Sequence, residues 1–344
     1  MPATTTSEAL APHRGRAAGI LSVAAASALV LSACGEAEAG DNGAAGSGET
    51  ITVEDDHGSH EVDLGAVESV GAFDNRTFRL LEDLGVELSV APRGLMQSHV
   101  HETYAEDESI LDTGNHREPD FEQLAAAEPD LVITGQRYSQ YYDEMADLMP
   151  EDGVILKWDE GTSDPTTFFE GLRGQATNIG ELFEAEEEAE ELIAELDEAI
   201  ERVESAYNGE DSVMGVVTSG GDINYAGPNQ GRGVAPVFQE FDLEPALEVD
   251  EETTDHEGDD ISVETIADSD PDWIIVLDRD GMTPDDPEYT EADELIADSP
   301  ALQQTAAIEN DQVVYMPQNM YITEDIQAYT EFLNDFADAL EGAE

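Results

Sequence analysis

Basic residues and cysteine are scarce in this chain. Its 344 residues include 12 lysines and arginines against 82 aspartates and glutamates, and Lys157 is the single lysine. A formal net charge of -70 excludes nucleic acid and anionic membrane surfaces as partners, because both would be repelled. Cys34 is the only cysteine, so no disulfide can form within the chain.

The sequence also lacks the short motifs that mark common catalytic sites. It contains no Gly-x-Ser-x-Gly motif, no P-loop and no Gly-x-Gly-x-x-Gly dinucleotide fingerprint. Apart from one segment near the N-terminus, no stretch is long and apolar enough to span a bilayer. The sequence therefore offers no candidate nucleophile for catalysis, and we expect a protein that is not an enzyme and does not cross a membrane.

The N-terminal segment has the pattern of an export signal. Arg14 and Arg16 precede an apolar, alanine-rich segment at 17–30, and Leu31-Ser32-Ala33-Cys34 resembles a bacterial lipobox. This pattern predicts a lipoprotein signal peptide at 1–33, a lipid on Cys34 and a flexible tether over 34–50. The protein would then be anchored to the extracellular face of the cell membrane. An ordinary signal peptide with an incidental cysteine is the alternative.

The acidic residues are distributed along the whole chain rather than held in one tail. The 40% apolar content persists with them, which favours a folded protein with the solvated surface of a halophile over a disordered chain. At about 1 M salt the Debye length is about 3 Å, so local groups decide what binds. The few arginines are therefore informative.

Two segments repeat each other 142 positions apart. Residues 122–137 and 264–279 share six of sixteen positions, including the first Glu and the last Arg. Each copy predicts a short helix that ends at Pro-Asp, then an apolar strand, then an arginine beyond the strand. In an open α/β sheet ligands bind at that end of the strands. Two such lobes would turn Glu122 and Glu264 outward, and Arg137 and Arg279 into a shared cleft, although helix-Pro-Asp-strand also recurs in unrelated α/β proteins.

The remaining pattern indicates which segments form each lobe. An N-terminal lobe is expected over 51–184, a long helix with an apolar stripe over 185–207 and a C-terminal lobe over 208–344. The helix is a candidate rigid connector between the lobes, or else an ordinary surface helix. Further expectations are a hairpin at 51–64, strands at 69–73, 86–91, 154–158, 213–218 and 313–316, and helices at 75–84, 166–183 and 326–340.

Together these features resemble a known family. The lipobox, the tether, the segments at 114–122 and 129–133, the long helix and the second repeat copy are similar to the substrate-binding lipoproteins of ABC importers. That resemblance implies an α/β fold of two Rossmann-like lobes joined by a long rigid helix, the class III periplasmic binding protein arrangement. Four short segments resemble the branch that binds ferric catecholate siderophores: 135–137, 227–232, 255–258 and 277–279.

The resemblance assigns the arginines to ligand binding. Arg137, Arg232 and Arg279 match the family's arginine trio, and a ferric tris-catecholate is a bulky trianion. Guanidinium groups stay charged, donate several hydrogen bonds and lie flat against aromatic rings. Arg76 follows the first strand and is a secondary candidate. For each arginine a salt bridge to one of the many acids is the alternative.

His256 and Tyr321 fall where the same branch places two ligands to the iron. Imidazole nitrogen and phenolate oxygen suit ferric iron, and a tetradentate siderophore leaves two coordination positions open for them. The alternatives are a solvated loop histidine and an ordinary packed tyrosine.

The resemblance further implies that Glu122 and Glu264 dock onto the two subunits of an ABC permease dimer, which works with an ATPase. Paired single charges far apart fix orientation while contributing little energy. Solvated surface glutamates are the alternative. A monomer with no intrinsic cofactor is expected, and the ferric siderophore is the transported ligand.

Three other functions remain open at this point. Haem or cobalamin would favour an aromatic cleft, whereas aromatics make up only 6% of the chain. A bare divalent metal would need histidines such as His57, His60, His99 and His101, which we expect to be solvated loop residues. The third alternative is a lipid-anchored hydrolase, for which no nucleophile stands out.

Overall fold

The computed structural model describes residues 49–343. Cys34, the predicted signal peptide at 1–33 and nearly all of the predicted tether lie outside the described residues. Among the described residues, no helix combines the length and the apolar composition that a membrane span requires.

The first half of the described chain begins with a hairpin and continues as a parallel sheet. The strands are β1 (Thr50–Asp55) and β2 (Gly58–Asp63) in the hairpin, then β3 (Val70–Phe73), β4 (Leu88–Ala91), β5 (Leu111–Asp112), β6 (Leu131–Thr134) and β7 (Val154–Lys157). The sheet order is β5-β4-β3-β6-β7. β3 and β6 are buried at every residue, as expected for central strands covered on both faces. The covering helices are α1 (Phe78–Asp83), α2 (Glu102–Glu106), α3 (Phe121–Ala127) and α4 (Tyr142–Leu148).

The second half builds a similar sheet. It contains β8 (Ser212–Ser219), β9 (Asp222–Tyr225), β10 (Glu244–Pro245), β11 (Trp273–Asp278) and β12 (Val313–Tyr315). The order is β10-β8-β11-β12, all parallel, and β9 pairs antiparallel with β8. Its short helices are α8 (Ala235–Phe241), α9 (Val263–Asp268), α10 (Ala292–Asp298) and α11 (Ala306–Glu309).

The strand of each repeat copy has an equivalent place in its sheet, which supports the predicted repeat. In each sheet the first strand in sequence pairs in parallel with the strand of the repeat copy: β3 pairs with β6, and β8 pairs with β11. On the other side, β3 pairs with β4 and β8 pairs with β10. The Pro-Asp of each copy makes an equivalent contact. Asp130 Oδ2 accepts a hydrogen bond from Ser69 N at 3.0 Å, and Asp272 Oδ2 accepts one from Ser212 N at 2.8 Å. Each aspartate thus ties the repeat strand to the start of its neighbour.

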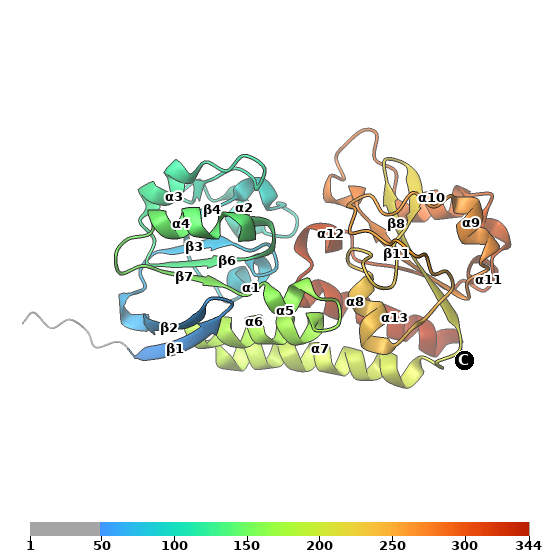
Figure 1. Cartoon of the computed structure of the whole chain (residues 1–344), viewed down its shortest axis with the longest axis horizontal. Coiled ribbons are helices and arrows are strands. Elements are labelled where there is room, and N and C mark those ends of the chain that lie inside the picture. The colour runs from blue at the N-terminus through green and yellow to red at the C-terminus, as the bar shows by residue number, and fades with distance from the viewer. Residues whose placement is uncertain (1–48, 344) are drawn as a thin grey trace, which may run out of the picture. The chain divides into compact units, whose positions relative to one another are not determined.

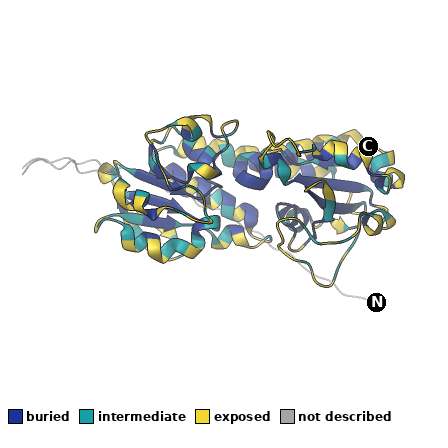
Figure 2. Ribbon diagram, turned by 90° about the horizontal axis from the view of Figure 1, so that it is seen from above, coloured by how far each residue is buried: buried dark blue, intermediate teal, exposed yellow. Residues whose placement is uncertain are grey.

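Five further helices cover and connect the sheets: α5 (Glu160–Ser163), α6 (Phe168–Leu182), α7 (Glu186–Ala206), α12 (Met320–Thr323) and α13 (Ile326–Ala343). The predicted long helix is α7, which packs against both α6 and α13 (Figure 1). Its apolar stripe is buried at Leu196, Ala199, Ile200 and Val203, whereas its other faces are exposed. Figure 2 shows the same division, with buried residues in the sheets and exposed ones on the outer surfaces of the helices.

Most predicted elements are present, with shifted ends. The hairpin, the strands and the three long helices are confirmed, and the fold is the predicted α/β class. The helix expected from residue 75 begins only at Phe78. Asp74 forms a turn there, because its Oδ1 accepts from Arg76 N and its carbonyl oxygen accepts from Thr77 N. The proposed boundaries at 51–184, 185–207 and 208–344 stay a prediction.

Candidate functional site

Two neighbouring cavities lie where the loops of the two sheets meet. The first, here called the basic cavity, has a volume of about 360 Å³. Its lining includes His116, Arg117, Arg137, His256, Arg279 and Tyr321. None of the described acidic residues lines it, although the chain carries 82 of them. The basic cavity is therefore a site of positive charge in a strongly negative protein.

The ring of Tyr321 is the centre around which three arginines gather. The guanidinium carbons of Arg232, Arg279 and Arg137 lie 4.6, 5.6 and 5.9 Å from the ring centroid. Distances under about 6 Å allow an attractive cation–π interaction, which offsets part of the repulsion among the three cations. The structure thus brings the predicted arginine trio together on the predicted tyrosine.

His256 completes this group. Its Nδ1 lies 3.0 Å from Arg232 Nη1 and 3.1 Å from the Tyr321 hydroxyl. A guanidinium can only donate, so Nδ1 must accept and carries no proton. Burial and the neighbouring Arg232, Arg137 and Arg279 lower the pKa of His256, which favours the neutral imidazole further. A neutral imidazole beside a phenol is a donor pair suited to a metal ion.

The arginines of the trio differ in their acidic partners. Arg232 pairs with Glu324 at 2.8 Å, and Arg279 lies 3.2 Å from Asp280. Arg137 forms no ion pair with any described residue; its Nη2 donates to the Tyr321 carbonyl oxygen at 3.3 Å. The buried Nε atoms of Arg137, Arg232 and Arg279 have no hydrogen-bond partner in the described part of the chain. Arg137 is therefore the member of the trio whose charge has no acidic partner among the described residues.

The strand ends and one locked loop hold the arginines in place. Arg137 follows β6 in the 3-10 helix Gln136–Tyr141, and Arg279 follows β11 directly, as the repeat predicts. Arg232 lies in the glycine-rich loop 227–233. Glu252 fixes that loop, because its Oε2 accepts from Asn229 N at 2.8 Å and from Gln230 N at 3.0 Å.

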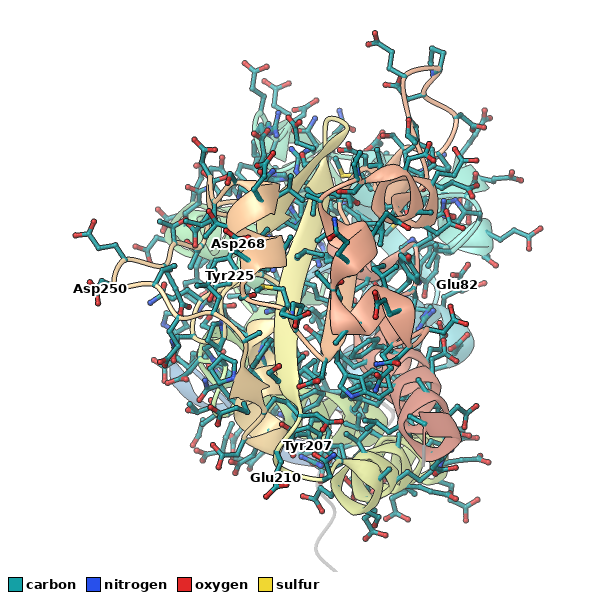
Figure 3. All side chains as sticks on the ribbon, turned by 90° about the vertical axis from the view of Figure 1, so that its right-hand side faces the viewer. Glu82, Tyr207, Glu210, Tyr225, Asp250 and Asp268 are labelled. Carbon is teal, nitrogen blue, oxygen red and sulfur yellow. The ribbon has the colours of Figure 1, made fainter. Side chains whose placement is uncertain are left out.

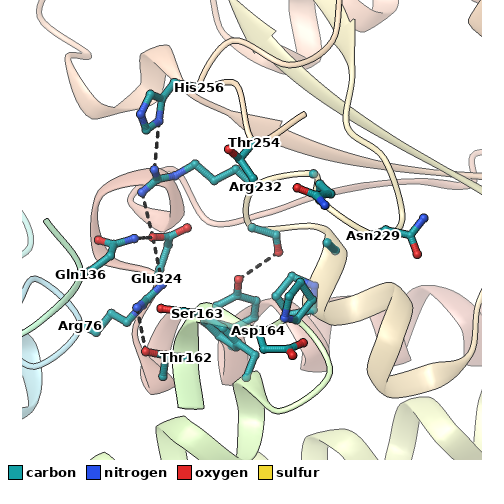
Figure 4. A pocket seen from close by; sticks show the side chains of 18 residues that line it. Arg76, Gln136, Thr162, Ser163, Asp164, Asn229, Arg232, Thr254, His256 and Glu324 are labelled. Atoms are coloured by element: carbon teal, nitrogen blue, oxygen red, sulfur yellow. Dashed lines mark hydrogen bonds and ion pairs between the residues drawn. The ribbon is translucent and has the colours of Figure 1, made fainter. Parts of the chain in front are cut away.

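The second cavity, here called the mixed cavity, has a volume of about 650 Å³ (Figure 4). His256 lines both cavities, whereas Arg232, Arg76 and Glu324 line only the mixed one. Arg76 is buried, and its Nη1 donates to Thr162 Oγ1 at 2.9 Å. Arg76, the secondary candidate from the sequence, therefore lines the mixed cavity and not the basic one.

Glu324 is the residue of the site that sequence reasoning missed. Its carboxylate is buried between Arg232 and Arg76 and accepts a hydrogen bond from Gln136 Nε2. Nothing distinguished it among 82 acidic residues. It lies two residues after the apolar segment Met320–Ile322 and just before the last helix, a position that does not by itself indicate burial.

Glu122 and Glu264 are 142 positions apart in the sequence and occupy equivalent positions in their helices. Each is the second residue of its helix, α3 or α9, and each is exposed. Each helix begins with a side-chain cap, since Asp120 accepts from Glu122 N and Ser262 accepts from Thr265 N. The carboxylates are thus fixed at the start of short, capped helices, and their role stays a prediction.

The expectation of four solvated loop histidines is wrong for two of them. His101 is 1% exposed, and its ring packs edge-on against Phe78. His60 lies in strand β2 and its Nε2 pairs with Asp55 Oδ1 at 2.9 Å. His57 and His99 are exposed. The spacing alone could not show that His60 would lie in a paired strand and His101 in the core.

Comparison with known proteins gives a consistent result. A family model described as periplasmic binding protein matches residues 70–320. The petrobactin-binding protein of Bacillus subtilis is 24% identical over 333 residues, which cover 94% of this chain and 98% of that protein. The ferric-anguibactin-binding protein of Vibrio anguillarum is 25% identical over 259 residues, 74% of this chain and 77% of that protein.

Solved structures agree in fold. The periplasmic catecholate-siderophore binding protein of Vibrio cholerae superimposes with a TM-score of 0.69 at 22% identity, covering 84% of this chain and 99% of the other.

Proposed function

Because the chain belongs to the periplasmic binding protein family, we propose that it is the solute-binding component of an ABC importer and captures a ferric siderophore. Its work is binding rather than catalysis. Relatives that bind petrobactin and ferric anguibactin support this cargo. We further propose that the siderophore is of the catecholate class.

The basic cavity is the observation that carries the proposal. It is lined by Arg117, Arg137, Arg279, His116 and His256 and by none of the described acidic side chains. Exposed charges are screened at high salt, whereas charges in a recessed cavity are screened much less. A compact anion with flat aromatic faces, such as a ferric catecholate, matches both the guanidinium donors and the stacking surface of Tyr321.

The pair His256 and Tyr321 supports iron itself as part of the ligand. Their side chains lie 3.1 Å apart, so both can reach one metal ion. A siderophore that uses four of the six positions of ferric iron leaves two for this pair. We propose that His256 and Tyr321 complete the coordination of the bound chelate. The iron is cargo, and no resident cofactor is implied.

Calorimetric titration of residues 35–344 in molar salt tests the cargo. We expect saturable binding of a ferric catecholate and much weaker binding of a ferric hydroxamate, haem, cobalamin or a bare divalent metal. A response to haem or to bare metal alone would overturn the siderophore assignment.

Arginine variants test the site. Arg137→Ala should weaken ferric catecholate binding by about tenfold to a hundredfold, the loss expected for hydrogen bonds to a charged group. Arg202→Ala is the matched control, because Arg202 bonds Asn334 at 2.8 Å on α13 and lines neither cavity. Equal affinity of the two variants would contradict the assignment.

We also propose that Glu122 and Glu264 dock onto a permease dimer driven by its ATPase. Each glutamate is exposed, and the two begin equivalent helices. Glu122→Ala and Glu264→Ala should leave ferric catecholate affinity unchanged and strongly reduce uptake of radioactive iron by cells. Glu198→Ala, an exposed change on α7, is the control. Loss of ligand affinity in the docking variants would show that these roles are wrong.

We propose that the protein is held at the cell membrane by a lipid on Cys34. The lipobox-like segment ending at Cys34 supports a lipid anchor on the extracellular face of the membrane. Beyond the anchor, we propose a lobe at 51–184, a connecting helix at 185–207 and a lobe at 208–344. Cys34→Ser should release the protein into the medium. Retention of that variant in the membrane fraction would exclude Cys34 as the anchor.

A further inference from the structure

Glu324 is an acidic residue enclosed by the basic groups of the site. Its side chain is 5% exposed, and its Oε2 lies 2.8 Å from Arg232 Nη2 and 3.7 Å from Arg76 Nη2. Gln136 donates a hydrogen bond to the same oxygen. Arg76 and Gln136 come from the first half of the described chain, and Arg232 comes from the second. One carboxylate therefore joins cavity residues from both halves (Figure 4).

The backbone at Glu324 and at Gln136 has an uncommon conformation. Glu324 has φ 45° and Gln136 has φ 23°, so both lie in the left-handed region that residues other than glycine rarely adopt. Such conformations persist where surrounding contacts fix them, often at ligand sites. Here the two strained residues are hydrogen-bonded to each other.

The charge of Glu324 acts on whatever occupies the cavities. Burial alone would raise the pKa of Glu324, but Arg232, Arg76 and Arg137 together hold it below its ordinary value, so the carboxylate is ionised. Most other carboxylates of the chain are solvated and screened. Carboxylates on the solvated surface project away from the protein, as Figure 3 shows for Glu210 and Asp250. Salt screens a buried charge much less.

We propose that Glu324 determines the net charge of the chelate that the site prefers. This inference rests on the proposed function. The carboxylate offsets the charges of Arg232 and Arg76, which leaves Arg137 as the arginine of the trio without an acidic partner among the described residues. A ferric chelate of low negative charge is then balanced, whereas a trianion meets both too little positive charge and the repulsion of Glu324.

The test compares affinities for ligands that differ in charge. Wild-type protein and Glu324→Gln are titrated in molar salt with a ferric tris-catecholate trianion, a ferric tetradentate bis-catecholate monoanion and a neutral ferric trihydroxamate. The variant should raise the affinity for the trianion relative to the monoanion by about tenfold or more, because one repulsive charge is removed. A purely structural role would change all affinities together and leave this ratio constant.

Two variants control for other causes. Glu324→Asp keeps the charge and should keep the wild-type ratio. Glu257→Gln removes a carboxylate that lies 3.8 Å from Arg279 but is 66% exposed, so it should shift the ratio little. Thermal unfolding checks that each variant folds, and Glu324→Met serves as a second neutral variant if Glu324→Gln does not.

The outcomes separate this inference from the proposed function. An unchanged ratio in folded neutral variants, or a shift toward the monoanion, overturns the role of Glu324 while capture of ferric catecholates stands. If wild-type protein binds no ferric catecholate, the proposed function itself fails.

Discussion

At the scale of single residues, His101 links burial to the pH dependence of stability. Burial and the neighbouring Arg79 lower the pKa of His101 to about 4. Its Nδ1 accepts from Gln97 N at 3.2 Å, a bond that requires the neutral ring. The unfolded chain protonates this histidine near pH 6.5 whereas the folded protein does not, so the folded state is penalised as the pH falls.

We predict that this histidine makes the protein sensitive to acid. Between pH 7 and pH 4 the wild type should lose about 3 kcal/mol more unfolding free energy than His101→Asn, which keeps an acceptor but does not titrate. Denaturant unfolding across this pH range measures the difference. Asp74 and Asp325, whose pKa values burial raises to about 6, act in the opposite direction in both proteins and cancel in the comparison. Parallel pH curves would contradict the prediction.

The residues of the site differ in how far sequence could reveal them. Arg137 and Arg279 could be found because the repeat places each beyond an apolar strand, and strand ends of parallel sheets hold ligands. Glu324 could not, because its importance arises from burial beside Arg232, a contact across more than ninety positions of the chain. Solvated and buried carboxylates look the same in a sequence.

At the scale of elements, helical periodicity predicted the long helices well and turn chemistry predicted their ends poorly. The apolar stripe of α7 fixed its length to within one residue at each end. The start of α1 was misplaced because the side chain of Asp74 competes for the backbone N–H of Arg76, and this competition depends on a local bond rather than on a repeating pattern.

Burial of the α7 stripe leads to a stability prediction. Leu196 is fully buried, so Leu196→Ala should reduce the free energy of unfolding by about 2–5 kcal/mol through lost apolar contact and a residual cavity. Denaturant unfolding in molar salt provides the measurement. Glu195→Ala, exposed on the same helix, should change stability by less than about 0.5 kcal/mol. Similar losses in both variants would mean that α7 is not packed as described.

At the scale of the molecule, the predicted acidic surface coexists with an ordinary core. Helices and strands occur throughout 50–343, so the alternative of a disordered chain is wrong for that range. Most of the described acidic residues lie on the outside, with Asp74, Asp278, Glu324 and Asp325 buried, and the apolar residues gather in the two sheets and along α6, α7 and α13. We therefore propose that binding depends on the basic cavity rather than on the overall charge.

Bonds between the two halves argue for a largely preformed site. Asn75 Nδ2 donates to the Ile322 and Thr323 carbonyl oxygens at 2.8 and 3.1 Å, and Asn75 is buried. Arg79 Nη2 donates to Asp325 Oδ1 at 3.1 Å. Residues 75–79 of the first half are thereby tied to the segment that carries Tyr321, and α7 packs on helices of both halves.

We therefore predict little closure on ligand binding. The radius of gyration of residues 35–344, measured by small-angle scattering with and without a ferric catecholate, should change by less than about 1 Å. The double variant Asn75→Ala, Arg79→Ala removes the cross-half bonds and should give a larger free form that contracts on loading. A large contraction of the wild type would show instead that these bonds form only after the ligand arrives, and that the arginine trio is assembled by the cargo rather than before it.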